Sequence, residues 1–364
     1  MGSSRARICI MRRQDWLFIA ALLCVPHSAY AQVSRVSLDA VIAADGDSGS
    51  SVARKPTSWI DVFGAVRLVD GLDFRVRPVV FRRSFDGEWR TRMYELALRY
   101  ERPGRVGLRL DAGQMPSPIG LSILENRPDV NPVISQHSTL YLPVPRFEAG
   151  TPTTYLLAAS YPLGAQVLAS TRIWDARVAV LDSSPIRGRS MTGESARPRL
   201  ANLVVGGGVT PRVGLRLGAS FARGGYAARS EVRDPRAGVR QATIGQVEGE
   251  WSFGYTRIAG EYLWTRREMA LASARVDGGW IEATHSLSPR WFTAARYDYQ
   301  QTSWVNAANA TAGREPYKRV EAAVGLRLTP EVTLRGSYLT RHGYVVSFWD
   351  DQVLASVVWA RKFR

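Results

Sequence analysis

The pentapeptide Val-Gly-Leu-Arg-Leu occurs three times in this chain, at 106–110, 213–217 and 324–328. Because successive side chains of a β-strand point to opposite faces, each copy has an apolar face of valine and leucine and a second face of glycine and arginine. The first two copies follow a tight turn and the third precedes one, so the copies lie on strands of opposite direction and are not one repeated folding unit. The same alternation extends over most of the chain, so the solvent that meets the apolar face decides the fold class.

The N-terminus has the pattern of a secretory signal peptide. Arg12 and Arg13 precede an apolar run at 16–25, and Ala29-Tyr30-Ala31 is a small-x-small cleavage site. The apolar run is shorter than the roughly 20 residues that a helix needs to span a bilayer. We predict that residues 1–31 are removed after Ala31 and that residues 32–364 form the mature protein.

Translation starts equally well at Met1 or Met11. Both cysteines, Cys9 and Cys24, lie in the removed segment, so the mature chain has no disulfide or thiolate metal site. The formal charge of +16 falls to +13 when the four arginines and one aspartate of the signal peptide are removed. Single arginines recur at alternate strand positions instead of clustering on one tail or face. This distribution favours an exported, anion-attracting surface over a nucleic-acid binder.

Tight turns alternate with longer polar connections along the chain. We predict the tight turns at Asp70-Gly71, 102–104, 162–164, 210–212, 252–254, 288–290 and 329–331, each of which contains proline or glycine. The predicted long connections are 45–57, 83–90, 114–152, 183–199, 223–240, 267–278, 302–317 and 343–349. Short turns at one end and long loops at the other are typical of outer-membrane barrels, and the pattern predicts about sixteen strands, including a weaker one at 33–44.

The two faces of these strands predict a barrel in a membrane. One face includes Tyr94, Leu96, Leu98 and Tyr100, whereas the charged residues between them point the other way. A barrel of about sixteen strands is wider than side chains can fill, so the charged face lines water and the apolar face meets lipid. We predict an all-β fold: a transmembrane antiparallel β-barrel with short periplasmic turns, a long third loop and aromatic girdles that include Tyr94.

The third long connection, 114–152, combines seven prolines with many aliphatic residues. This composition argues against disorder, and loops of such length are usually functional. We expect the loop to fold into the barrel and narrow the channel. An external lid, or a latch that contacts other subunits of a trimer, is the alternative.

The stretch 111–121, Asp-Ala-Gly-Gln-Met-Pro-Ser-Pro-Ile-Gly-Leu, resembles the start of the channel loop in the phosphate-selective porin O/P-like superfamily. The residues that match its motif are Gly113, Gln114, Pro116, Pro118 and Gly120. The resemblance implies a 16-stranded barrel, commonly trimeric, that passes phosphate, polyphosphate or small carboxylates. Phosphate-selective members bring lysines into the pore, whereas this chain has only Lys55, Lys318 and Lys362, so it fits the broader porin group.

Basic and acidic side chains on the charged face are the candidates for solute selection, because rings of basic residues in a channel favour anions. Most are expected to pair across strands as a solvated wall. A functional ladder is expected where arginines lack partners, at Arg75 and Arg77 beside Arg105 and Arg109. The candidate pore-lining or constriction residues are Arg75, Arg77, Arg99, Arg105, Arg109 and Asp111 on strands, and Glu125, Arg127, Arg146 and Glu148 in the loop.

Enzymatic and metal-binding signals are weak. The mature histidines, His137, His285 and His342, lack the spacing of a metal site, and nothing groups a serine with a base and an acid. We expect no catalytic activity, no metal and no cofactor. The prediction is an outer-membrane porin for passive diffusion of small hydrophilic solutes, anionic or neutral, with a modest anion preference.

The expected partners are outer-membrane lipid and lipopolysaccharide, the barrel-assembly machinery through the C-terminal strand with Phe363, and two further subunits in a homotrimer; nucleic acid is not expected. Two other functions fit the sequence. One is a non-transporting outer-membrane barrel that acts as an envelope scaffold or surface-interaction protein. The other is a secreted, soluble all-β binding protein.

Overall fold

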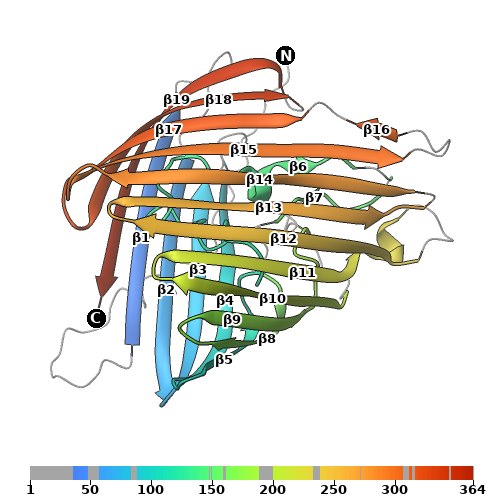
Figure 1. The fold of residues 1–364 in the computed structure, drawn as a ribbon, viewed down its shortest axis with the longest axis horizontal. Coiled ribbons are helices and arrows are strands. Elements are labelled where there is room, and N and C mark those ends of the chain that lie inside the picture. The colour runs from blue at the N-terminus through green and yellow to red at the C-terminus, as the bar shows by residue number, and fades with distance from the viewer. Residues whose placement is uncertain are drawn as a thin grey trace, which may run out of the picture. The chain divides into compact units, whose positions relative to one another are not determined.

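The computed structural model describes residues 36–47, 57–82, 88–146, 148, 150–158, 161–187, 200–232, 238–270, 272–305, 311–313, 316–343 and 346–363. They form a closed antiparallel β-barrel of sixteen strands, which confirms the predicted fold class. The first strand pairs with the second and also with the last, and this double pairing closes the sheet (Figure 1). The predicted signal peptide lies outside the described residues.

The barrel strands follow one another in space as they do along the chain. They are β1 (Val36–Asp47), β2 (Thr57–Val69), β3 (Leu72–Arg82), β4 (Trp89–Arg102), β5 (Gly107–Gln114), β8 (Leu163–Ser170), β9 (Trp174–Leu181), β10 (Asn202–Arg212), β11 (Leu215–Ala227), β12 (Arg240–Phe253), β13 (Thr256–Glu268), β14 (Ser273–Ser286), β15 (Trp291–Val305), β17 (Tyr317–Arg327), β18 (Val332–Gly343) and β19 (Val346–Phe363). A short strand, β16 (Thr311–Gly313), pairs with the end of β15.

The tight turns all lie at one end of the barrel, together with the start of β1 and the end of β19. Five of the seven predicted turns are found within a few residues of their predicted positions. The prediction at 162–164 is wrong, because β8 begins at Leu163 and the hairpin turn is 171–173. The prediction at 210–212 is displaced, because β10 continues through Pro211 with a bulge and turns at 213–214.

Burial in the barrel is the reverse of burial in a soluble protein. Leu96 and Leu98 on β4 are each 44% exposed, whereas Glu95 on the same strand is buried. On β15 and β17, Arg296, Asp298 and Glu321 are likewise buried. A closed sheet with its apolar face outward and its charged face inward requires an apolar solvent around it, as a lipid bilayer provides.

A β-bulge changes the direction of one predicted girdle residue. The register between β3 and β4 shifts between Arg77 and Pro78, because proline has no N–H to give to the ladder. Tyr94 is the extra residue on β4 and points inward, where it is buried. The prediction that Tyr94 belongs to the outer aromatic girdle is therefore wrong.

The connection between β5 and β8 is longer than predicted and spans residues 115–162. Its two ends meet where Met115 N donates to Pro162 O at 3.1 Å. It contains the short helix α2 (Ser138–Tyr141) and a small ladder between β6 (Pro143–Val144) and β7 (Thr154–Tyr155). Residues 153–161 thus belong to this connection, here called the long loop, and not to a barrel strand. Within the described residues, no helix is long and apolar enough to cross a membrane.

Candidate functional site

The long loop is bound to the inward face of β12, β13, β15, β17 and β18. Carboxylates on three of these strands accept hydrogen bonds from backbone N–H groups of the loop. The contacts are Leu121 N to Glu261 Oε2 (2.6 Å), Ser138 N to Asp298 Oδ1 (2.8 Å) and Ile134 N to Glu321 Oε1 (2.9 Å). Because a loop in a barrel interior has few backbone partners of its own, these carboxylates satisfy donors that would otherwise be buried unpaired.

Arginines of the same strands donate to backbone carbonyls of the loop. The contacts are Arg267 to Tyr155 O (2.6 Å), Arg319 to Gln136 O (2.6 Å), Arg335 to Val133 O (3.1 Å) and Arg296 to Ser135 O. The side chains of Arg319 and Asp298, 2.7 Å apart, are 1% and 0% exposed. Buried charges are tolerated only when they are paired and hydrogen-bonded, as here. We call this set the anchoring wall: Gln246, Glu261, Arg267, Arg296, Asp298, Arg319, Glu321 and Arg335.

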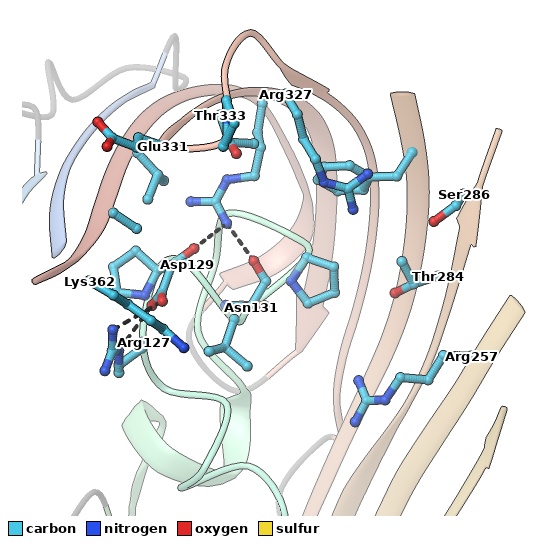
Figure 2. Close-up of a pocket in the computed structure, with 18 of the residues that line it drawn as sticks. Arg127, Asp129, Asn131, Arg257, Thr284, Ser286, Arg327, Glu331, Thr333 and Lys362 are labelled. Atoms are coloured by element: carbon cyan, nitrogen blue, oxygen red, sulfur yellow. Dashed lines mark hydrogen bonds and ion pairs between the residues drawn. The ribbon is translucent and has the colours of Figure 1, made fainter. Parts of the chain in front are cut away.

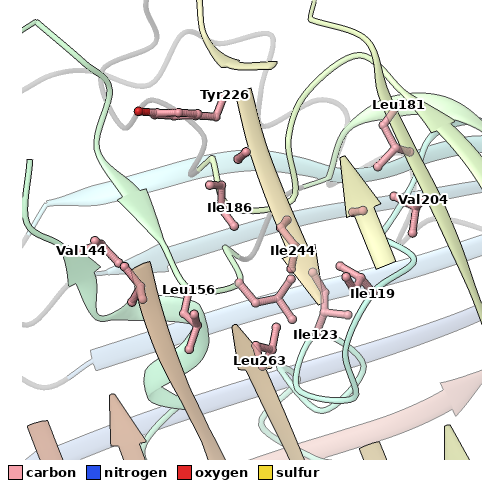
Figure 3. Close-up of a cluster of buried hydrophobic side chains, with 14 of the residues drawn as sticks. Ile119, Ile123, Val144, Leu156, Leu181, Ile186, Val204, Tyr226, Ile244 and Leu263 are labelled. Carbon is pink, nitrogen blue, oxygen red and sulfur yellow. The ribbon is translucent and has the colours of Figure 1, made fainter. Parts of the chain in front are cut away.

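Apolar contacts hold the half of the loop that lies nearer the long connections. Ile119, Ile123 and Leu156 of the loop belong to one buried cluster with Ile244 of β12 and Leu263 of β13 (Figure 3). The cluster also contains inward residues of β9, β10, β11 and β14. The aliphatic residues of the loop therefore have an apolar surface to pack on, which accounts for their abundance in the sequence.

The ends of the loop are attached to the bulge of β4. The ring of Tyr161 stacks on Tyr94 with 4.1 Å between centroids. At the other end, Gln114 Nε2 donates to the backbone carbonyl of Met93. The misplaced tyrosine and the motif glutamine are thus parts of one attachment point.

Position 120 requires glycine because neighbouring atoms leave no room for a side chain. Its φ of +90° lies in the left-handed region, and a Cβ there would come 2.2 Å from the Leu157 side chain. Its N–H donates to Gln246 Oε1 at 3.1 Å. The motif residues Gly113, Gln114, Pro116, Pro118 and Gly120 therefore shape the start of the loop, and none of these glycines or prolines offers a charged group to a solute.

On the other strands, inward arginines keep partial contact with solvent. We call Arg75, Arg99, Arg109, Arg177 and Arg216, which lie on β3, β4, β5, β9 and β11, the arginine wall. Each pairs with a carboxylate that is more buried than the arginine; Arg99 has a second, exposed partner in Glu101 (3.7 Å). The Arg109 side chain is 31% exposed, whereas its partner Asp111, 3.0 Å away, is 2% exposed. The Arg216 side chain is 28% exposed, whereas its partner Glu248, 2.6 Å away, is 1% exposed.

Inward-facing glycines let two of these arginines lie flat against the sheet. A Cβ at Gly206 would come 3.0 Å from Arg177 Nε, and one at Gly208 would come 2.8 Å from Arg216 Nη2. Gly206 and Gly208 therefore leave a recess for arginine side chains.

A cavity of about 770 Å³ lies at the short-turn end, beneath loop residues 127–132 (Figure 2). Its lining includes six cationic and three anionic side chains. They are Arg127, Arg257, Arg327, Arg335, Arg361 and Lys362, against Asp39, Asp129 and Glu331. Arg127 and Asp129 form an ion pair at 3.0 Å within it. The space at this end is thus predominantly basic.

The predicted ladder of unpartnered arginines is wrong in two respects. Arg75 pairs with Glu95 (3.2 Å) and Arg77 with Asp61 (2.6 Å), so these arginines have partners. Arg105 lies in the exposed turn 103–106 and not on the inward face of a strand.

The four candidate residues of the loop have different partners in the structure. Their contacts are Arg127 to Asp129, Arg146 to Thr153 Oγ1 (2.9 Å), Glu125 to Arg257, and Glu148 to Arg240 (2.9 Å). Of the two loop arginines, only Arg127 pairs with a loop carboxylate among the described residues. The two glutamates instead tie the loop to β13 and β12.

None of the anchoring residues is among the predicted constriction candidates, and the prediction of strand faces also missed Gln246, Arg267 and Arg319. Arg267 was placed in the predicted connection 267–278, whereas β13 continues to Glu268. Arg319 follows Lys318 directly, and only the alternation of outward Lys318 with inward Arg319 distinguishes them. Gln246 shares the inward face of β12 with Glu248 but carries no charge. Their partners are more than a hundred residues away in sequence, which no local pattern records.

His137 is packed as a structural residue. Its ring lies 4.2 Å from Trp280, and Nε2 is 3.4 Å from the Glu125 carboxylate. Burial, with the nearby Arg296 guanidinium, holds the pKa of His137 well below its usual value, so the ring is neutral. Among the described residues, no serine hydroxyl hydrogen-bonds this ring and no group of three or more histidine, cysteine, aspartate or glutamate side chains could hold a metal ion.

Comparison with solved structures finds the same barrel fold in outer-membrane proteins. An anion-selective porin from Comamonas acidovorans aligns with 90% of this chain and 99% of its own, with a TM-score of 0.57 and 12% identity. The outer-membrane channel DcaP of Acinetobacter baumannii aligns with 92% of this chain and 100% of its own, with a TM-score of 0.57 and 10% identity. OmpT of Vibrio cholerae, expressed in the outer membrane, aligns with 92% of this chain and 100% of its own, with a TM-score of 0.55 and 11% identity. No protein-family model and no curated protein sequence matches the chain. At these identities the likeness concerns the fold.

Proposed function

We propose that this protein is an outer-membrane porin, a passive diffusion channel for small hydrophilic solutes with a preference for anions. The long loop reduces the cross-section by occupying the side of the lumen next to the anchoring wall. Solutes then pass along the arginine wall and through the basic cavity at the short-turn end. No chemical step is involved.

The observation that carries the anion preference is the unequal exposure within ion pairs. On the arginine wall the guanidinium groups meet water, while their partners Glu95, Asp111 and Glu248 are buried behind them. A solute in the lumen therefore encounters cations first, although the wall as a whole is nearly neutral. Rings of exposed basic groups in a narrow, water-filled pore favour anions.

Planar-bilayer recording tests this proposal. Mature protein refolded in detergent is inserted into a bilayer, and the reversal potential is measured under a KCl gradient. We expect a steady conductance with a reversal potential of the sign given by chloride permeation. Arg109→Gln combined with Arg216→Gln should move the reversal potential towards zero, because both groups stand at the exposed side of their ion pairs.

The matched control is Arg212→Gln, since Arg212 lies on the outer side over the ring of Trp251, with 5.3 Å between its guanidinium carbon and the ring centroid. This variant should keep the wild-type reversal potential. Absence of any current from correctly folded protein would reject a channel. A cation-selective reversal potential in the wild type would reject the anion preference alone.

A second candidate function is a closed barrel that acts as an envelope scaffold or surface-interaction protein. Two buried apolar clusters favour it: the loop packs against β9 to β14, and Tyr161 packs among aromatic residues of β2, β3 and β4. If these clusters fill the lumen completely, the folded protein will conduct no ions, and the bilayer experiment therefore separates the two functions.

The proposal includes location and partners. Export by the N-terminal signal with cleavage near Ala31, assembly by the barrel machinery through β19 and Phe363, and residence in lipopolysaccharide-containing outer membrane all fit such a channel. The name of one similar structure specifies a trimer form of OmpT from Vibrio cholerae, and we include a homotrimer in the proposal. Chemical cross-linking in outer membranes tests the homotrimer, and the absence of any cross-linked species larger than the monomer would argue against it. Membership of the phosphate-selective superfamily is tested by competition between phosphate and chloride currents.

A further inference from the structure

Two arginines face each other on the outer surface, near the end of the barrel that carries the long connections. Arg266 on β13 and Arg275 on β14 are directly opposite in the strand register. Arg266 alternates with the inward, buried Thr265 and Arg267, so it belongs to the outer face. Tyr262 and Trp264 are the preceding outward residues of β13, and both are exposed.

The depth of this pair in the bilayer follows from energetics. An arginine on the lipid face costs about 2–4 kcal/mol at the bilayer midplane and about 0–1 kcal/mol near the interface. Tyrosine and tryptophan collect at the interface, and Arg266 lies one outward position beyond Trp264. Arg266 and Arg275 are therefore at the level of lipid headgroups.

The protein neutralises the two arginines unequally. Arg275, 64% exposed, pairs with Asp277 at 2.7 Å, whereas Arg266 makes no ion pair among the described residues. Like charges directly opposite one another on a sheet are destabilising. The nearby Glu268, also outward, accepts a hydrogen bond from the Gln241 backbone N–H at 3.2 Å.

The arginines line a groove that could receive a ligand group. The groove has a volume of about 770 Å³. Its lining residues on the outer face are Thr243, Tyr262, Trp264, Arg266, Ser273 and Arg275. It therefore combines two guanidinium groups, three hydroxyl groups and two aromatic rings, a set of groups that suits a phosphate attached to an apolar or sugar body.

We propose that Arg266 and Arg275 form a binding site for the phosphate of a glycolipid headgroup in the leaflet at the long-connection end. One phosphate bridges the two guanidinium groups and removes their repulsion, while the acyl chains lie along the aromatic girdle below. The proposal rests on the membrane placement in the proposed function, and it adds a specific ligand class and a specific site.

Native mass spectrometry of the mature protein in detergent tests the site. Wild-type protein, Arg266→Gln with Arg275→Gln, and the control Arg212→Gln are each titrated with bis-phosphorylated lipid A and with lipid A that lacks both phosphates. We expect the double variant to bind the phosphorylated lipid about thirtyfold more weakly, as two surface arginines near an anionic lipid imply. The control variant should bind like the wild type, and heat-modifiable gel migration shows that each variant is folded.

Three results would overturn the proposal. Equal affinity for the two forms of lipid A would show that phosphate is not recognised, and an unchanged affinity in the double variant would show that the site is elsewhere. Displacement of the lipid by millimolar inorganic phosphate would show a free-anion site instead of a lipid site. Bilayer conductance of the double variant should equal that of the wild type, so loss of the channel proposal and loss of the lipid site are separate outcomes.

Discussion

The anchoring wall and the arginine wall both contain arginines paired with carboxylates, but the two walls differ in how far these side chains are buried. On the anchoring wall, Arg319 and Asp298 are both fully buried, and the remaining donors of the arginine bind the loop. On the arginine wall, Asp111 is buried while Arg109 remains in contact with water. Arginine–carboxylate pairs therefore serve as fixed supports where a loop covers them, and as a cation-presenting surface where the lumen is left open.

The first prediction would break the anchoring wall. Arg319→Leu leaves Asp298 without one of its charged partners and the Gln136 carbonyl without its donor. Removal of one partner of a buried pair costs about 3–5 kcal/mol, so we expect a large loss of stability. Urea unfolding in detergent, followed by tryptophan fluorescence, measures it, and limited proteolysis within 127–136 should become faster.

The control is Arg67→Leu, which removes an exposed ion pair with Asp73. Pairs of that kind contribute about 0–1 kcal/mol. If both variants lose equal stability, burial does not distinguish the pairs and the contrast between the walls is wrong.

The second prediction tests whether the exposed guanidinium groups of the arginine wall set the anion preference. Asp111→Asn removes the negative charge that Arg99 and Arg109 share but keeps an oxygen that can accept from them. We expect a stronger anion preference, seen as a larger reversal potential under the same KCl gradient. Loss of hydrogen bonds to a charged group implies a stability decrease of about 1.5–3 kcal/mol. A weaker anion preference would contradict the assigned role of the exposed guanidinium groups.

The third prediction concerns the recess beneath the arginines. In Gly206→Ala the new methyl group meets Ser220 Oγ at 2.5 Å and Arg177 Nε at 3.0 Å, so Arg177 must move towards the lumen. We expect a lower single-channel conductance and a stability loss of about 1 kcal/mol. Gly336→Ala is the matched control, because a Cβ at this outward glycine of β18 meets nothing within 4 Å. Equal conductance in the two variants would argue against the recess.

The fourth and smallest effect is a pH dependence of loop attachment. The pKa of buried His137 is lowered, so the released loop takes up a proton more readily than the bound loop as pH falls below the usual histidine value of about 6.5. Attachment is therefore at full strength above that pH and weakens below it. Proteolysis of the loop should be faster at acidic pH in the wild type. His137→Asn should lose that part of the dependence, and an unchanged profile would remove His137 as its cause.

Strand number and faces were predictable because alternation is local. Glu95, Leu96 and Leu98 lie as their spacing requires. Tyr94 was not predictable from alternation because the bulge shifts the register by one residue, and Pro78 on the neighbouring strand was the available signal. The true end of the long loop was missed because Thr154 and Tyr155 form β structure with another part of the loop; the consecutive apolar residues Leu156-Leu157-Ala158 do not alternate and could have excluded a barrel strand.

The candidate site was less predictable than the fold. The sequence indicates which side chains face inward, but not which pairs the loop covers. That distinction depends on contacts such as Ile134 with Glu321, 187 residues apart, and on the path of the loop through the barrel. The arginine wall and the anchoring wall therefore look alike in sequence and separate only in three dimensions.

The sequence distance of these contacts has a consequence for biogenesis. In the proposed assembly the barrel forms after export, and the inward face that holds the loop exists only once β12 to β18 have paired. Loop docking must wait for the C-terminal strands, and contacts of such separation form slowly because a long chain segment must first be closed. The native loop is thus a late product of folding, and its resistance to protease should appear only after the last strands have joined the sheet.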